Sequence, residues 1–131
     1  MIVADASALC ELLLARPRAG AIRRAISAHT ELHVPAHFDL EMLSALRRYA
    51  LRGQLSDIDA ARALTALADL RTLTYPVREL IGPIWELRFG LTSYDAAYLA
   101  LARRLDAGLI TLDKALASAA TADGRLVALG G

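Results

Sequence analysis

The sequence has one cysteine, one lysine and no long apolar run. The first shortage excludes an internal disulfide, and the last excludes a membrane-spanning helix. Cys10 alone cannot form an internal disulfide, which suits a reducing compartment. It lies within an apolar helical pattern, so we expect a buried structural thiol rather than a nucleophile. No apolar stretch reaches the roughly 20 residues of a membrane-spanning helix, and Asp5 interrupts the N-terminus where a signal sequence would need an apolar core. We therefore expect a soluble, cytoplasmic protein without membrane association.

Basic side chains other than arginine are nearly missing, since Lys114 is the only lysine. The 15 Lys and Arg residues almost balance the 14 Asp and Glu residues, and a net charge of +1 does not indicate a nucleic-acid partner by itself. Arginine forks phosphates better than lysine, so the arginine clusters at 16–24 and 47–52 are candidates for holding a polyanion. A coding bias toward arginine on solvated helix faces explains these clusters equally well.

The length of 131 residues provides for one domain with its own core, so we expect a single domain over residues 1–131. Apolar residues make up 56% of the chain, above the usual share of roughly 45–50%. Much of the excess is Ala and Leu on helical patterns. Such an excess is compatible with apolar surface reserved for a partner subunit.

Short apolar segments alternate with helical patterns along the whole chain. The strands are expected at residues 1–4, 31–34, 72–75, 108–112 and 125–129. The helices are expected at residues 6–15, 17–28, 37–51, 57–70, 77–89, 94–105 and 114–120, with the fifth kinked or split at Gly82 and Pro83. Short strands that are apolar on both faces and separated by helices predict a parallel sheet. The expected fold is therefore an α/β/α three-layer sandwich with a central parallel sheet.

Four acidic residues stand where a predicted strand gives way to a helix, or on a helix that follows a strand: Asp5, Glu41, Asp95 and Asp113. Parallel strands direct their C-terminal ends to one edge of the sheet, where ligand sites gather, so these acids should converge. Clustered carboxylates repel each other unless a cation lies among them. Carboxylate oxygens without Cys or His ligands suit Mg²⁺ or Mn²⁺ rather than zinc. The pattern predicts a metal-dependent enzyme that acts on phosphate esters.

Each of these acids also has a local explanation. Asp5 and Asp113 could cap the helices that follow them, and Asp95 could complete a capping box with Thr92. Glu41 could be an ordinary surface glutamate. For any one residue alone the local explanation is favoured, but three of the acids follow strands at the same sheet edge, which favours a shared site.

Asp39 is a competitor of Glu41 for the fourth place in this site. The two residues are separated by about 200° of rotation on a helix, so they cannot both face one ion. Asp39 lies near the start of its helix, where the helix dipole favours an acid. We therefore select Glu41.

Three histidines at a spacing of four residues, His29, His33 and His37, would suggest a zinc site on one helix face. Pro35 and the strand pattern around it break that helix, so the three are expected to be partly exposed and unrelated. Trp85 lies among apolar residues of its helix and is expected in the core or in an interface.

Four segments together resemble a known family: VADASAL at 3–9, PAHFDLEMLSALRR at 35–48, LTSYDAAYLALARR at 91–104 and LITLDKAL at 109–116. In this order and spacing they resemble the PIN-domain ribonucleases, and among these the VapC-type toxins of bacterial toxin–antitoxin pairs. The resemblance implies a PIN-like fold and metal-dependent endonucleolytic cleavage of RNA. It also implies a homodimer that is neutralised by a cognate VapB-type antitoxin. The residues that it assigns as catalytic groups and ligands of Mg²⁺ or Mn²⁺ are Asp5, Glu41, Asp95 and Asp113, with Ser7 and Thr111 holding these ligands or contacting phosphate.

The main alternative is a PIN-like module that binds RNA or protein without cleaving it. Its signature would be the loss of one or more of the four acids, and all four are present. A receiver domain would need an acidic pair after the first strand, and a haloacid-dehalogenase-type phosphatase would need Asp-x-Asp there. This chain has Asp5-Ala6-Ser7, which fits neither.

Overall fold

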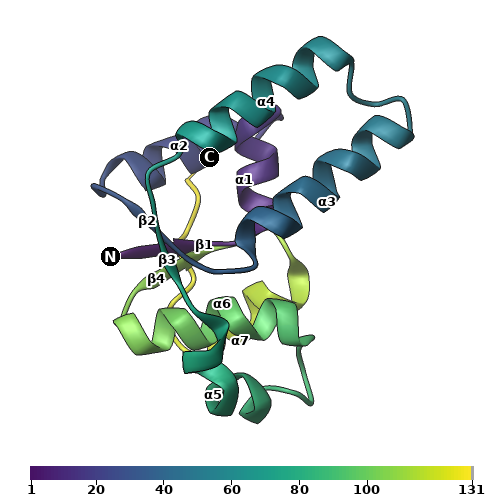
Figure 1. Ribbon diagram of the computed structural model, residues 1–131. Helices are drawn as coiled ribbons and strands as arrows, with labels where there is room; N and C mark the ends of the chain where they lie inside the picture. The colour runs from purple at the N-terminus through teal and green to yellow at the C-terminus, as the bar shows by residue number, and fades with distance from the viewer. Residues whose placement is uncertain (131) are drawn as a thin grey trace.

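Four parallel strands form the centre of the computed structural model, which describes residues 1–130 (Figure 1). The strands are β1 (Ile2–Ala4), β2 (Leu32–Pro35), β3 (Thr72–Tyr75) and β4 (Gly108–Ile110), in the spatial order β3-β2-β1-β4. The helices are α1 (Ala6–Leu13), α2 (Ala19–Ser27), α3 (Phe38–Leu51), α4 (Asp57–Asp69), the 3₁₀ turn η1 (Val77–Leu80), α5 (Ile81–Glu86), α6 (Ser93–Leu105) and α7 (Lys114–Ala122). Figure 1 shows α1 to α4 on one side of the sheet and α5 to α7 on the other. The predicted α/β/α sandwich with a parallel sheet is confirmed.

The strand order creates a crevice beside β1. From β1 the chain moves to β2 and β3 on one side, and it returns to place β4 on the other side. Ligands of open α/β sheets bind at such a reversal, at the C-terminal ends of the strands. The backbone N–H of Asp5 donates to the carbonyl of Ile110 at 3.1 Å, which joins the two strand ends. Residues that follow β1 and β4 are therefore held next to each other.

Helix α6 is the most deeply buried helix of the fold. All residues from Ala96 to Ala102 are buried, and four of these seven are alanine, which lets the helix lie close to β1, β2 and β4. A helix that is apolar on all sides is typical of a buried position. Because the first turn of α6 carries Asp95, this packing fixes one of the predicted site residues.

Three features of the secondary structure differ from the predictions. The expected strand at 125–129 is a single bridge between Leu109 and Leu126, because Leu109 alone uses both its backbone groups to pair with this segment. The helix expected at 77–89 is split into η1 and α5, which was one of the two expected outcomes, but it ends at Glu86. Strand β3 is an edge strand with partly exposed residues, whereas both faces were expected to be buried.

Gly108 allows the C-terminal segment to lie beside β4. A Cβ atom at this position would come within 2.8 Å of the Val127 Cγ2 atom. Any larger residue would push the segment away from the sheet.

Within residues 1–130, no helix combines the length and the apolar composition that are needed to cross a bilayer.

Candidate active site

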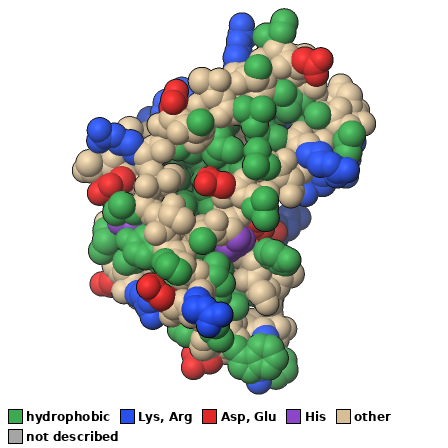
Figure 2. All heavy atoms as spheres, viewed as in Figure 1, with side chains coloured by type: hydrophobic (Ala, Val, Ile, Leu, Met, Phe, Trp, Pro, Cys, Tyr) green, Lys and Arg blue, Asp and Glu red, His purple; other side chains and the backbone are tan. Residues whose placement is uncertain are grey.

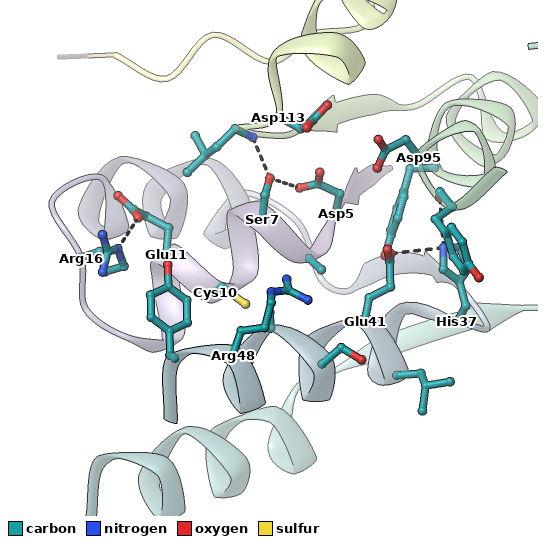
Figure 3. Close-up of a pocket in the computed structure, with 18 residues that line it drawn as sticks. Asp5, Ser7, Cys10, Glu11, Arg16, His37, Glu41, Arg48, Asp95 and Asp113 are labelled. Atoms are coloured by element: carbon teal, nitrogen blue, oxygen red, sulfur yellow. Dashed lines mark hydrogen bonds and ion pairs between the residues drawn. The ribbon is translucent and has the colours of Figure 1, made fainter. Parts of the chain in front are cut away.

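A cavity of about 700 Å³ opens at the C-terminal edge of the sheet, and all four predicted acids line it (Figure 3). Asp5 follows β1, and Asp113 follows β4 and precedes α7. Glu41 comes from the first turn of α3, and Asp95 comes from the first turn of α6. The structure thus brings together four carboxylates that are spread over more than 100 residues of sequence. Asp39 is exposed and does not line the cavity, so the choice of Glu41 over Asp39 agrees with the geometry.

Asp5 lies at the floor of the cavity with only 3% of its surface exposed. Its Oδ1 atom accepts hydrogen bonds from the Ser7 hydroxyl at 2.7 Å and from the Ala8 N–H at 3.1 Å. Its Oδ2 atom accepts one from the Thr111 hydroxyl at 2.6 Å. Burial raises the pKa of Asp5, the three donors counteract this, and the negative charge of Asp113 raises the pKa further. Asp5 is therefore fixed in orientation but short of positive charge.

Ser7 and Thr111 hold the two sides of the cavity floor together. The Ser7 oxygen accepts from the Leu112 N–H at 3.0 Å, and the Thr111 oxygen accepts from the Asp113 N–H at 3.0 Å. Both hydroxyl protons are already directed at Asp5, so the 3.4 Å approach of the two hydroxyl oxygens is a contact without a proton to share. The two hydroxyls therefore link the end of β1 to the segment that carries Asp113.

Asp95 and Asp113 stand at the start of their helices. The Thr92 hydroxyl caps α6 by accepting from the Asp95 N–H at 3.2 Å, and Asp113 caps α7 by accepting from the Leu116 N–H at 2.9 Å. Burial raises the pKa of Asp95, and the negative charges of Asp113, Asp5 and Glu41 raise it further. The carboxylates are therefore close enough to repel one another, as predicted for a cluster without a cation.

Glu41 is held by two residues that the sequence analysis did not select, Tyr98 and His37. The Tyr98 hydroxyl donates to Glu41 Oε1 at 2.6 Å, and His37 Nε2 lies 3.2 Å from the same oxygen (Figure 3). His37 Nε2 also lies 3.0 Å from the carbonyl oxygen of Tyr94, which can only accept, so this nitrogen carries the proton. Burial alone would raise the pKa of Glu41, but these bonds and the charge of Arg48 lower it overall. Glu41 is thus the ionised and oriented member of the group.

The signals for these two residues were present but weak. His37 stands four residues before Glu41 on the same helix, a spacing at which side chains meet. His37 is partly exposed, as expected, but its contact with Glu41 was not predicted. Tyr98 follows Asp95 by one helical turn, but its contact with Glu41 spans 57 positions and no local pattern announces it.

Other expectations for single residues had mixed outcomes. Cys10 is buried as predicted, and burial raises its pKa to about 11, which makes it a poor nucleophile. His33 was expected to be partly exposed, but it is buried and its Nδ1 atom lies 2.7 Å from the Tyr75 hydroxyl. Trp85 is 65% exposed, so it is not part of the core.

The donor set fits a hard divalent cation. Four carboxylates face one cavity, and carboxylate oxygens are the ligands that Mg²⁺ and Mn²⁺ prefer. In residues 1–130 no three His, Cys, Asp or Glu side chains are already closed around a single ion position. Mutual repulsion keeps bare carboxylates apart, and an octahedral ion that retains water requires only a few protein oxygens.

Comparison with known proteins assigns the class of this fold and site. The PIN domain family matches residues 2–122, which include the four acids. Ribonuclease VapC9 of Mycobacterium tuberculosis is 45% identical over 113 residues, which cover 86% of this chain and 86% of VapC9. The chain therefore belongs to the PIN-domain family, among its VapC ribonucleases.

Solved structures show the same fold. The crystal structure of Mycobacterium tuberculosis VapC20, a toxin that cleaves the sarcin–ricin loop, has a TM-score of 0.69 at 19% identity and covers 91% of this chain and 95% of that one. A toxin–antitoxin complex from Klebsiella pneumoniae has a TM-score of 0.59 at 19% identity, covering 86% and 87% of the two chains. At these identities the likeness concerns the fold alone.

Proposed function

We propose that this protein is a metal-dependent endoribonuclease of the VapC toxin type. The observation that carries the proposal is the convergence of Asp5, Glu41, Asp95 and Asp113 on one cavity in a chain that belongs to the VapC ribonucleases. The substrate would be the phosphodiester backbone of RNA.

In this proposal the four carboxylates are the ligands of Mg²⁺ or Mn²⁺. When bound, such an ion lowers the pKa of a water molecule and offsets the charge that builds up on the phosphorus. The chain itself supplies the orientation of the ligands. Ser7 and Thr111 hold the Asp5 carboxylate by hydrogen bonds of 2.7 and 2.6 Å.

Glu41 has a second task in the proposed reaction. Only its Oε1 atom is engaged by Tyr98 and His37, so the other oxygen is free to orient a water molecule or a ligand. Its lowered pKa keeps it ionised at neutral pH, so this oxygen can accept a hydrogen bond from the water molecule and orient it.

The proposal includes a cognate antitoxin of the VapB type and a homodimer. Support comes from the fold shared with a toxin–antitoxin complex and from apolar side chains that remain exposed, among them Ile81, Trp85 and Phe89 near α5. Figure 2 shows hydrophobic side chains gathered over the α3–α4 pair and at the lower end of the molecule near α5. Light scattering of the purified chain should give twice the protomer mass of 14.1 kDa. A mass of one protomer at micromolar concentration would contradict the dimer and leave the nuclease proposal intact.

The test of the activity is cleavage of total cellular RNA by purified protein with Mg²⁺, with Mn²⁺ or with a chelator. Asp5→Asn and Asp95→Asn should abolish cleavage, because each removes a charged ligand and keeps the side-chain shape. Asp39→Asn is the matched control, since Asp39 is an exposed acid on α3 that does not line the cavity. Discrete fragments from wild type and Asp39→Asn alone, with metal, are the expected result.

The alternative of a PIN-like binding module without catalysis makes the opposite prediction. The binding module would be favoured if the folded, antitoxin-free wild-type protein binds RNA but yields no fragments with any metal. Equal cleavage by all four proteins would show that the activity resides outside these acids.

A further inference from the structure

The cavity has a second, basic end that the acids do not explain. Two arginines line it, Arg16 and Arg48. Arg16 is neutralised, because its Nε atom lies 3.1 Å from Glu11 Oε1 and its guanidinium stacks over the Tyr49 ring at 5.4 Å. Arg48 forms no ion pair and no side-chain hydrogen bond with any of residues 1–130.

Arg48 points into the cavity rather than away from it. Figure 3 shows its guanidinium between Cys10 and Glu41, among the side chains that line the cavity. The positive charge of Arg48 lowers the pKa of both residues, in each case against the larger effect of burial. The positive charge of Arg48 therefore acts on residues of both α1 and α3, and without a fixed partner it is available to a ligand.

The position of Arg48 follows from the spacing of residues on α3. Residues 41, 44, 45 and 48 of this helix all line the cavity, at the spacing of one helical face. Seven residues separate Glu41 from Arg48, which corresponds to two turns or about 10 Å along the helix axis. One face of α3 therefore runs from the acidic centre to a free guanidinium.

We propose that Arg48 forms a subsite for a phosphate of single-stranded RNA next to the phosphodiester that is cleaved. The inference rests on the proposed ribonuclease function and adds the residue that holds the flanking strand. A guanidinium binds phosphate oxygens in bidentate geometry, and here it lies beside the acidic centre, where its positive charge offsets part of the repulsion between the carboxylates and a phosphate. The proposed ligand is single-stranded RNA, because a cavity at the sheet edge admits an extended strand with its bases turned outward. Most proteins that recognise specific RNA sequences bind single-stranded RNA in this way.

The test is RNA binding as a function of salt, without divalent metal and in an Asp95→Asn background that does not cleave. A fluorescein-labelled single-stranded RNA is titrated with this protein, and with the same protein carrying Arg48→Ala, Arg48→Lys or Arg47→Ala. Arg47 is the matched control, because it is an exposed arginine on the same helix that does not line the cavity. The loss of one phosphate contact should reduce the slope of log K against log salt by about 0.7, or about fivefold in affinity for each tenfold change in salt.

Arg48→Ala should show this reduced slope, whereas Arg48→Lys and Arg47→Ala should keep the parent slope. In the cleaving protein, Arg48→Ala should raise KM severalfold with kcat nearly unchanged, as expected for a contact made equally in the ground and transition states. If Arg48→Ala and Arg47→Ala gave the same slope of log K against log salt and the same KM, the subsite would be overturned. RNA cleavage by the wild type would still support the nuclease proposal in that case. Tighter binding of a duplex than of a single strand would also overturn it, and no RNA binding or cleavage at all would remove both proposals.

Discussion

Replacement of Thr111 by valine tests how far the hydroxyls at the cavity floor stabilise the site. Valine keeps the shape of threonine and removes the hydroxyl that donates to Asp5 at 2.6 Å and accepts from the Asp113 N–H at 3.0 Å. A hydrogen bond to a charged group contributes about 1.5–3 kcal/mol, and the second bond adds about 1 kcal/mol. We therefore expect the free energy of unfolding to fall by about 2.5–4 kcal/mol, with a loss of roughly 3–5 °C in Tm per kcal/mol for a chain of this size.

Activity should fall as well, because Asp5 loses one of its three donors and can turn away from its position. A misplaced ligand costs up to about 100-fold in rate, so kcat for RNA cleavage should drop by roughly 10- to 100-fold. Thr111→Ser is the control, since it keeps the hydroxyl and loses one methyl group, worth about 0.8 kcal/mol. Denaturant unfolding and single-turnover cleavage measure both effects. If Thr111→Ser lost as much as Thr111→Val, packing rather than the hydroxyl would hold the floor and the reasoning would fail.

Three further predictions follow from the same geometry. Tyr98→Phe removes only the 2.6 Å hydrogen bond to Glu41. It should lower kcat about tenfold and reduce the free energy of unfolding by about 1–2 kcal/mol. An unchanged kcat in single-turnover cleavage would show that this bond does not position Glu41. The pKa values of Asp5 and Asp95 are raised from 3.8, so in the metal-free protein these two groups bind more protons in the native state than in the unfolded state, and their contribution to the free energy of unfolding should fall as pH rises above about 4. In chemical unfolding measured at several pH values, Asp95→Asn should reduce this decrease in the free energy of unfolding. Mn²⁺ should raise the Tm of the wild type but not that of the variant. The same dependence of the free energy of unfolding on pH in both proteins would contradict repulsion between the carboxylates. Cys10, with its pKa raised to about 11, should not react with an aromatic disulfide reagent at pH 8 until the protein is unfolded, and rapid labelling of the native state would show that the thiol is accessible.

The site acids could be predicted from sequence because their placement depends on local order along the chain. Asp5 and Asp113 follow strands that are recognisable as short apolar runs, and parallel strands bring their C-terminal ends to one edge. The helix period separates Glu41 from Asp39 without any knowledge of the tertiary structure. Each of these inferences needs only the position of a residue relative to a strand end or a helix face.

The residues that hold the acids depend on contacts between distant elements, and sequence patterns do not contain them. Tyr98 meets Glu41 across 57 positions, and it does so because α3 and α6, on opposite faces of the sheet, both line the cavity at its C-terminal edge. The strand expected at 125–129 failed for a similar reason. Its apolar pattern is real, but only Leu109 offers both backbone groups for pairing, and this depends on how β4 lies against the segment.

The local and the functional explanations of the acids turn out to be compatible. Asp5 caps α1 through the Ala8 N–H, Asp113 caps α7 through the Leu116 N–H, and both face the cavity. The N-terminus of a helix carries a partial positive charge, so these caps place each carboxylate where the fold already offsets part of its charge.

This arrangement explains how the fold accommodates four carboxylates around one cavity. The helix termini and the hydroxyl donors stabilise the individual acids, and their mutual repulsion is left for a cation to relieve. It also determines which substitution is informative. Asparagine caps a helix about as well as aspartate does, whereas alanine loses about 0.5–2 kcal/mol of cap stability, so an alanine variant would combine a folding defect with the loss of a ligand. A loss of cleavage in Asp113→Asn, if the variant unfolds at the wild-type temperature or above, therefore reports on the charge, whereas Asp5→Asn also replaces one of two accepting oxygens by an amide donor.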